Sequence, residues 1–282
     1  MNIIHTHSEL ITYLASLPTN TSIGFVPTMG ALHSGHKSLI IRCLRENSIC
    51  VCSVFVNPKQ FENKYDFSRY PSNISNDIIL LKECGCQVLF HPDLSEIYPQ
   101  NLESKIFQFN GIENILEGAS RQGHFHGVAK IVSRLFDLVK PSRAYFGQKD
   151  AQQLYIIESL QKQAYPKIEI VSCPIIRDDD GLAMSSRNEL LSEPQRNAAS
   201  RIYSRLLLAK NHAEKMSIKQ LKKWMRNEYM CDTDLQLDYF EISDPRTFIS
   251  SKEWGLSKEH LACIAVYAGE IRLIDNIFIE IN

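Results

Sequence analysis

Two histidines, His33 and His36, stand three residues apart in a stretch that also carries two glycines. The apolar run 23–26 precedes them and apolar residues at helical spacing follow, which predicts a corner between a buried strand and a helix. A helix that begins at Ser34 or Gly35 places both imidazoles on one face of its first turn. Backbone N–H groups at such a turn attract anions, so the corner predicts a phosphate site. Ordinary loop histidines beside a buried strand are the alternative.

A second polar stretch, 146–150, stands where an apolar run ends and a helical pattern begins. Gly147 permits close approach of the backbone to a ligand, Lys149 supplies a positive charge for phosphate, and Asp150 can accept hydrogen bonds from ribose hydroxyls. The stretch therefore predicts part of a nucleotide site. A helix N-terminus at the surface with a favourable aspartate explains it equally well.

A third polar stretch, 184–188, follows a sharp Asp-Asp-Asp-Gly turn. It carries two hydroxyls and a guanidinium in succession, from Ser185, Ser186 and Arg187. Such groups suit the oxygens of a triphosphate. A polar linker between two domains fits the same residues, and spacing alone does not decide between these interpretations.

The fourth stretch, 57–61, directly follows the apolar run 49–56, which is predicted to be a strand. In a parallel sheet the loops after the strands gather at the carboxyl edge, where ligands bind. Gln60 lies in this loop, and its amide can both donate to and accept from a substrate with hydroxyl and carboxylate groups. We therefore expect Gln60 to face a small polar substrate.

Short apolar runs alternate with helical patterns through the first 175 residues. The predicted strands are 23–26, 49–56, 88–90, 106–109, 144–146 and 168–171. The predicted helices are 8–17, 37–46, 75–85 with Ser75 as its cap, 128–139 and 154–160, and 65–71 is predicted to be a loop. This alternation predicts an α/β fold, a Rossmann-like parallel sheet with helices on both faces, although the Gly-x-Gly-x-x-Gly fingerprint is absent.

The composition changes after Pro174, which predicts a smaller C-terminal α+β domain. Its predicted elements are a long helix from 192, a lysine-rich helix over 218–229, a strand over 235–239 and an antiparallel hairpin of 261–267 with 271–281. We expect two domains, 1–175 and 176–282, with a hinge near 175–185.

The overall composition is that of a soluble globular chain with nearly balanced charge. Of 282 residues, 44% are hydrophobic and 22% charged, and the formal net charge of −1 gives no basic footprint for nucleic acid or an anionic membrane. No apolar run reaches bilayer length and no signal-peptide pattern is present, so we expect a cytoplasmic protein. Eight cysteines include the pairs Cys50/Cys52 and Cys84/Cys86, but neither has the two-residue gap typical of zinc sites. We expect reduced, mostly buried thiols.

The string 27–36 resembles the His-x-Gly-His motif of the nucleotidylyltransferase superfamily, and its full length is similar to one family, the pantoate–β-alanine ligases (pantothenate synthetases). The resemblance extends to 116–119, 121–125 and 272–276, and so covers nearly the whole chain. It implies a reaction in two steps. ATP and pantoate give pantoyl adenylate and pyrophosphate, and β-alanine then attacks the mixed anhydride to give pantothenate and AMP.

The resemblance also implies roles for individual residues. The implied ATP contacts are Met29, Gly30, Ala31, Leu32, His33, Ser34, Gly35, His36, Gly147, Gln148, Lys149, Asp150, Ile176, Met184, Ser185, Ser186 and Arg187. Among these, His36 stands at the position of proton donation, and His33, Lys149 and Arg187 complete the implied catalytic set. Gln60 and Gln153 match the pantoate-binding glutamines. Mg²⁺ with ATP and a homodimer are further implications, and the C-terminal domain would act as a lid.

At a few positions the sequence differs from the family pattern, and the main difference affects the expected Mg²⁺ site. Asn76 precedes Asp77 where the family has an acidic pair, so Asp77 is left as the candidate residue near Mg²⁺. The segment 215–219 resembles the Lys-Met-Ser-Lys-Ser loop of tRNA synthetases but is interpreted as a solvated helix start.

Two other functions stay open at this point. One is an adenylyltransferase of the coenzyme A or NAD pathways. The other is an RNA-binding synthetase relative, although the count of Lys plus Arg, 31, does not exceed that of Asp plus Glu, 32.

Overall fold

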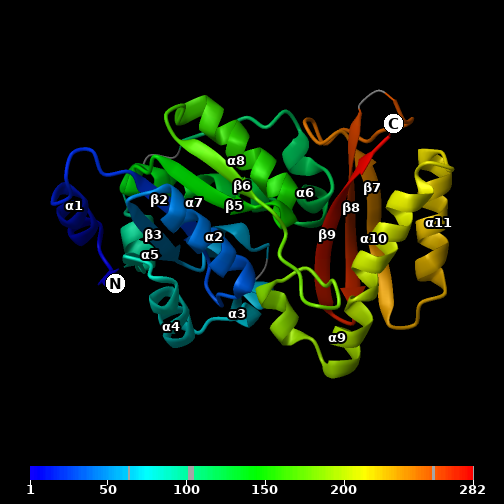
Figure 1. The fold of residues 1–282 in the computed structure, drawn as a ribbon, viewed down its shortest axis with the longest axis horizontal. Helices are drawn as coiled ribbons and strands as arrows, with labels where there is room; N and C mark the ends of the chain where they lie inside the picture. The colour runs from blue at the N-terminus through cyan, green and yellow to red at the C-terminus, as the bar shows by residue number, and fades with distance from the viewer. Residues whose placement is uncertain (63, 101–104, 256–257, 282) are drawn as a thin grey trace. The chain divides into compact units, whose positions relative to one another are not determined.

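The computed structural model describes residues 1–62, 64–100, 105–255 and 258–281, which form two compact units (Figure 1). The first unit comprises 1–148 and 153–174, and the second comprises 149–152 and the chain from 175 onward. Residues 149–152 therefore belong to the second unit, although they lie inside the predicted first domain. The domain division at 175 stays a prediction.

The described residues of the first unit contain a six-stranded sheet in the order β1-β4-β3-β2-β5-β6, and its paired strands run parallel. The strands are β1 (Asn2–Ile4), β2 (Ile23–Thr28), β3 (Ile49–Val54), β4 (Val88–Phe90), β5 (Arg143–Gly147) and β6 (Glu169–Cys173). The helices up to residue 164 are α1 (His7–Ala15), α2 (Ser34–Glu46), α3 (Lys64–Arg69), α4 (Ile74–Cys84), α5 (Leu94–Ile97), α6 (Glu117–Ser120), α7 (His124–Val139) and α8 (Ala151–Ala164). Short 3-10 turns are η1 (Pro58–Gln60), η2 (Ile112–Asn114) and η3 (Gln148–Asp150). The predicted α/β fold is confirmed.

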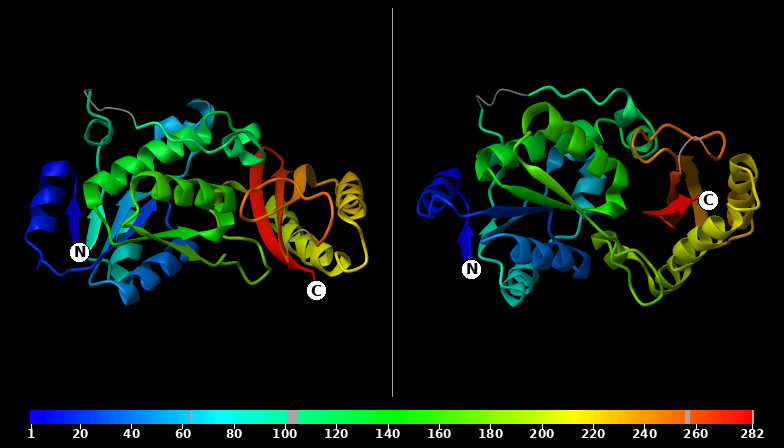
Figure 2. Two further views of the ribbon diagram at one scale, coloured as in Figure 1. Left: turned by 90° about the horizontal axis from the view of Figure 1, so that it is seen from above. Right: turned by 45° about the horizontal axis from the view of Figure 1, so that its top comes forward.

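Helices cover both faces of this sheet, with α2 and α4 on one face and α7 on the other (Figure 2). Side chains alternate along a strand, so every second residue faces the same layer. Val26, Cys50 and Cys52 are fully buried in the cluster that α2 and α4 cover. The cysteines of β3 therefore serve as small apolar core residues, as the sequence predicts.

The strand order reverses between β2 and β5. From β2 the chain continues to β3 and β4 on one side, and later adds β5 and β6 on the other. Gly24 lies opposite Arg143, so the register brings the last residues of both strands, Thr28 and Gly147, to the same edge. In open parallel sheets, ligands bind at the carboxyl edge where the order reverses. The fold therefore places the histidine corner at the expected binding edge.

The second unit contains an antiparallel sheet of three strands in its described part, β7 (Leu235–Ser243), β8 (Glu259–Ala268) and β9 (Ile271–Glu280). Its helices are η4 (Ser186–Leu190), α9 (Glu193–Ala199), α10 (Arg201–His212) and α11 (Ile218–Met230). α10 packs against β9 and α11 against β7. The predicted α+β class is confirmed, but the long helix expected from 192 is divided at Ser200 into α9 and α10.

Two predictions in the first unit are wrong. Segment 65–71, expected to be a loop, contains most of α3, in which the Arg69 guanidinium lies over the Tyr65 ring and donates to its hydroxyl at 2.5 Å. That i,i+4 contact supports a short helix. Segment 106–109, expected to be a strand, has no strand assignment; Ile106 is 90% exposed while Phe107 and Phe109 are buried. Apolar alternation there reflects packing of single rings rather than sheet pairing.

Smaller differences concern element ends. The cap of α4 is Asn73, whose side chain accepts from the Asn76 N–H, rather than Ser75. Gly85 closes the same helix with φ 81°, as expected for a glycine in the left-handed region. The strand β1, three residues long, was not predicted, because so short a run carries no readable period.

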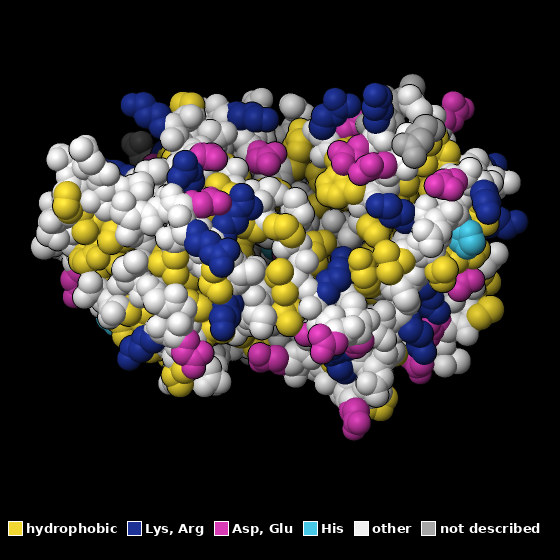
Figure 3. Space-filling model, in the orientation of Figure 1, with side chains coloured by type: hydrophobic (Ala, Val, Ile, Leu, Met, Phe, Trp, Pro, Cys, Tyr) yellow, Lys and Arg dark blue, Asp and Glu magenta, His cyan; other side chains and the backbone are white. Residues whose placement is uncertain are grey.

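Among the described residues, no helix combines the length and the apolar character needed to cross a membrane. On the face drawn in Figure 3, basic and acidic side chains are intermixed. All eight cysteines are free thiols, and Cys231 is the exposed one.

Candidate active site

The histidine corner has the geometry that the sequence predicts. α2 begins at Ser34 with His33 as its N-cap. Nδ1 of His33 accepts from the Gly35 N–H at 3.1 Å, and Nδ1 of His36 accepts from the His33 N–H at 3.3 Å. The two ring centroids are 4.1 Å apart. This reciprocal capping holds both imidazoles side by side in the first turn.

These backbone hydrogen bonds decide which ring nitrogen carries the proton. A backbone N–H can only donate, so each Nδ1 must be an acceptor. In a neutral imidazole the hydrogen then resides on Nε2. His33 and His36 therefore each present an Nε2–H donor, as a group that stabilises developing negative charge must do.

The loop before the corner is tightly shaped. Gly30 has φ 88° and Ala31 has φ 48°, both in the left-handed region. A Cβ on Gly30 would lie 2.9 Å from an Asp77 carboxylate oxygen and 2.9 Å from a Val54 methyl, so a larger residue would strain the backbone and displace one of these side chains. Asp77 is 1% exposed, and its Oδ1 accepts from the Leu32 N–H at 2.7 Å. The loop of 29–32 is thus supported from α4.

This geometry bears on the expected metal role of Asp77. A divalent cation such as Mg²⁺ seeks accessible oxygens and keeps several waters, whereas the Asp77 carboxylate is buried and bonded to backbone. The described residues also contain no group of three His, Cys, Asp or Glu that could hold a metal ion. The present geometry of Asp77 therefore suits loop support rather than direct coordination, and its predicted place near Mg²⁺ stays a prediction.

Gln60 is held in a buried hydrogen-bond chain. Its Nε2 lies 3.0 Å from Met29 Sδ, and its Oε1 accepts from Asn57 Nδ2 at 3.1 Å. Asn57 Oδ1 in turn accepts from the Tyr98 hydroxyl at 3.0 Å. Burial raises the pKa of Tyr98, which keeps the phenol protonated as a donor. The structure thus joins two predicted residues, Met29 and Gln60.

Three residues that surround Gln60 were not predicted from the sequence. Asn57 and Tyr98 orient the Gln60 amide, and His124 Nδ1 lies 2.7 Å from the Gln60 carbonyl oxygen. Asn57 stands three residues before Gln60 in the same loop, so its amide was a readable signal. Tyr98 and His124 carry no such signal, because their contacts depend on tertiary packing.

At the β5 end, Gly147 closes the strand and Gln148 follows it in η3. A Cβ on Gly147 would meet no described atom within 4 Å, so packing in the described chain does not require glycine there. Gln153 lies in the first turn of α8 and is half-buried. No described contact joins Gln153 to Gln60.

In the second unit, the predicted residues on either side of the Asp-Asp-Asp-Gly turn come together. The Met184 N–H donates to the Ile176 carbonyl at 3.0 Å, and Arg177 bridges Ala183, so 176–184 forms a small hairpin. Ser185 then caps η4, accepting from the Arg187 N–H at 3.3 Å. Ser186 is buried, and Arg187 is half-buried. The polar stretch is therefore an ordered turn.

Polar residues of β9 contact the predicted Lys149 and also Arg177, which directly follows the predicted Ile176. Asn276 Nδ2 donates to the Lys149 carbonyl at 2.9 Å, and Asp275 forms a two-pronged ion pair with Arg177. Burial raises the pKa of Asp275, and the adjacent Arg177 acts in the opposite direction. Asp275 and Asn276 carried no role in the sequence analysis, although two polar residues inside an apolar strand are a visible signal.

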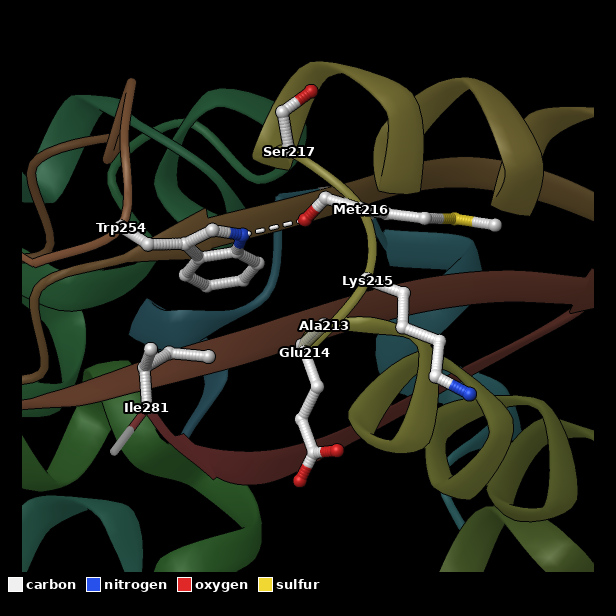
Figure 4. A pocket seen from close by; sticks show the side chains of 7 residues that line it. All are labelled: Ala213, Glu214, Lys215, Met216, Ser217, Trp254 and Ile281. Atoms are coloured by element: carbon white, nitrogen blue, oxygen red, sulfur yellow. Dashed lines mark hydrogen bonds between the residues drawn. The ribbon is translucent and has the colours of Figure 1, made fainter.

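A cavity of about 400 Å³ lies elsewhere in the second unit (Figure 4). It is lined by Ala213, Glu214, Lys215, Met216, Ser217, Trp254 and Ile281. Trp254 Nε1 donates to the Met216 carbonyl, and the Lys215 side chain points away from Trp254 and Ile281. Ser217 caps α11. The segment that resembles a synthetase loop is therefore a helix start, and this cavity contains none of the predicted site residues.

The first unit is a parallel sheet with His33 and His36 at the edge where the strand order reverses, and a small α+β unit follows it. This is the architecture of an α/β nucleotide-binding enzyme. The family model described as pantoate–β-alanine ligase matches residues 2–278. A pantothenate synthetase from Bacteroides thetaiotaomicron is 44% identical over 278 residues, covering 98% of each chain.

Two solved structures are also similar. The pantothenate synthetase of Thermus thermophilus has a TM-score of 0.91 and 39% identity, over 98% of this chain and 99% of that one. The pantoate–β-alanine ligase of Francisella tularensis, complexed with β-γ ATP and β-alanine, has a TM-score of 0.81 and 35% identity, over 98% and 97%. The chain belongs to the pantoate–β-alanine ligase family. The resemblance stated from the motifs is confirmed, and the two alternative functions are set aside.

Proposed function

We propose that this chain condenses pantoate with β-alanine in an ATP-dependent reaction that passes through pantoyl adenylate and releases AMP and pyrophosphate. Membership of the ligase family supports this assignment, as does the Francisella tularensis relative, which is complexed with β-γ ATP and β-alanine. The observation that carries it is the imidazole pair: two Nε2–H donors at the edge where nucleotides bind in such sheets.

The residue roles follow from the charge that the reaction develops. Attack of the pantoate carboxylate on the α-phosphorus builds negative charge on the phosphate and on departing pyrophosphate. His36 would donate a hydrogen bond or proton to that charge, with His33 beside it. Lys149 and Arg187 would supply positive charge, and the other proposed ATP contacts remain those named from the sequence. Gln60 and Gln153 would hold the hydroxyl and carboxylate groups of pantoate.

We place Mg²⁺ with the substrate rather than with a protein cage. Mg²⁺ commonly enters nucleotide sites on phosphate oxygens and keeps most of its waters. The absence of a three-residue ligand group among the described residues suits that mode. ATP would therefore arrive as its magnesium complex.

The second unit would serve as a lid. A mixed anhydride such as pantoyl adenylate hydrolyses unless water is excluded. The polar turn 184–187 belongs to that unit, so closure would bring it to the phosphates and shelter the intermediate. A homodimer and a cytoplasmic location complete the proposal. Free thiols support the reducing compartment, and the dimer rests on the family resemblance.

Pyrophosphate release from ATP tests this function. With pantoate alone, the expected result is a burst of one pyrophosphate per site; with β-alanine added, the burst becomes steady formation of AMP and pantothenate. RNA in place of β-alanine is the control. No pantoate-dependent pyrophosphate at any Mg²⁺ concentration would contradict the proposal.

A further inference from the structure

Asp275 and Asn276 occupy the middle of β9, and each is 4% exposed. The strand around them is otherwise largely apolar and belongs to the core of the second unit. Burying an amide and a carboxylate is costly unless each finds partners. Their partners therefore indicate what this strand holds in place.

Asn276 holds the peptide of Lys149. Its Nδ2 donates to the Lys149 carbonyl at 2.9 Å, and its own N–H donates to Asp275 Oδ1 at 2.8 Å. The Lys149 ammonium also acts electrostatically on the Asp275 carboxylate. Lys149 lies in the short 3-10 turn η3, and the Asn276 amide adds a tertiary anchor for its carbonyl from β9.

Asp275 holds the hairpin of 176–184. Its two oxygens accept from Arg177 Nη1 at 2.6 Å and Nη2 at 2.9 Å, a geometry that fixes orientation as well as distance. Arg177 Nη1 also donates to the Gly181 carbonyl at 3.1 Å, and the guanidinium lies 3.5 Å from the Tyr203 ring centroid. A buried ion pair adds little net stability, so its value here is geometric.

We propose that Asp275 and Asn276 are positioning residues of the ligase reaction. Asn276 fixes Lys149, and Asp275 fixes, through Arg177, the hairpin that leads into Met184. One strand thereby sets the spacing between the two segments of the second unit that meet the phosphates of ATP. This inference rests on the proposed function, because that function places both segments at the phosphates.

The test measures pyrophosphate release from ATP and pantoate by Asn276→Ala. Loss of the amide lets the Lys149 peptide shift, so kcat should fall roughly 10- to 100-fold. The KM for pantoate should stay within about twofold, since Gln60 belongs to the other unit. The Asn276→Ser side chain is also too short to reach the Lys149 carbonyl. This variant should therefore show the same lower kcat with an unchanged KM for pantoate, and it can replace Asn276→Ala if that variant does not fold.

A double-mutant cycle distinguishes a role of Asn276 in positioning Lys149 from a general loss of structure in the second unit. In a Lys149→Ala background, Asn276→Ala should lower kcat by less than about twofold further, because its effect passes through the lysine. Ile279→Ala is the matched control: Ile279 is fully buried on the same strand. At a temperature where that variant is folded, its kcat should stay within about twofold of the wild type.

Three results would overturn the inference: full kcat in both Asn276 variants, an equal loss in Ile279→Ala, or independent effects of the two substitutions in the cycle. Each of these leaves the proposed function standing, provided that the wild-type chain releases pyrophosphate with pantoate. A wild-type chain inactive in that assay would overturn the proposed function and this inference together.

Discussion

The histidine corner of the first unit is held by hydrogen bonds among residues 33–36, whereas Lys149 of the second unit is held by a side chain 127 positions away in the sequence. In the corner, backbone N–H groups orient the imidazoles, so the helix N-terminus and the donor pair are one structure. In the second unit, a buried amide and a buried ion pair orient the predicted phosphate contacts.

The difference shows why the two regions should respond differently to substitution. The corner depends on local chain geometry, so a change there should affect chemistry more than folding. The β9 network joins segments that are distant in sequence, so a change there should affect chemistry and the packing of the second unit together. Measurements of activity and of stability on the same variants can therefore test whether the two regions differ in this way.

The largest expected effect is on activity, from a change at the corner. His36→Ala should lower the rate of adenylate formation by roughly 10²–10⁴, since it removes a preorganised donor from the developing charge. Single-turnover release of pyrophosphate with pantoate checks this. Near-normal turnover would remove His36 from the chemistry.

Two variants of the same residue sharpen that prediction. His36→Asn retains an acceptor near the position of Nδ1, which can still cap the His33 N–H, but it has no donor at the position of Nε2. His36→Gln retains a donor near Nε2. If the donor matters, the glutamine variant should be the more active one, although the asparagine variant, which retains the cap, should be at least as thermally stable. The reverse order of activities would show that capping, not donation, is the role.

A middle-sized effect is expected at the buried chain around Gln60. Gln60→Ala should raise the KM for pantoate roughly 10- to 100-fold, because the substrate loses hydrogen bonds worth about 1–3 kcal/mol. The affinity for ATP, measured by calorimetry without pantoate, should stay unchanged. Weaker ATP binding instead would move Gln60 to the nucleotide side.

The smallest effect concerns Arg196 of the second unit, which forms ion pairs with both Asp178 and Asp180. The hydrogen bond from Arg196 lowers the pKa of Asp180. A lowered carboxyl pKa stabilises the fold above the unfolded pKa, and this contribution is lost as the pH falls through the folded pKa. Since the Asp180 side chain is 40% exposed, Arg196→Ala should cost only about 0.2–1 kcal/mol near neutral pH.

Chemical denaturation at neutral and acid pH checks that sign. The stability difference between wild type and Arg196→Ala should shrink below the folded pKa of Asp180, where the carboxyl is protonated in both states. A difference that grows on acidification would contradict the assignment. A loss of several kcal/mol would mean that peripheral pairs, too, hold this unit together.

The features that could be predicted from the sequence are those whose physical cause acts between residues close together in the chain. The parallel sheet, the helix start at Ser34 and the C-terminal hairpin were readable because periodicity and capping act within a few residues. The loop expected at 65–71 was wrong because the contact of Arg69 with Tyr65 supports a short helix. The strand expected at 106–109 was wrong because its alternating pattern reflects the burial of two single rings.

The sequence by itself determined the donors: the residue types at the corner, the family they belong to and the α/β order that carries them. Only the tertiary structure decided which distant side chains support the site. The hydrogen bond from Tyr98 to Asn57 and the support of Lys149 by Asn276 each join residues that are far apart in the sequence. Such bonds join atoms only after strands and helices have packed, and residue spacing does not encode which distant side chain completes them.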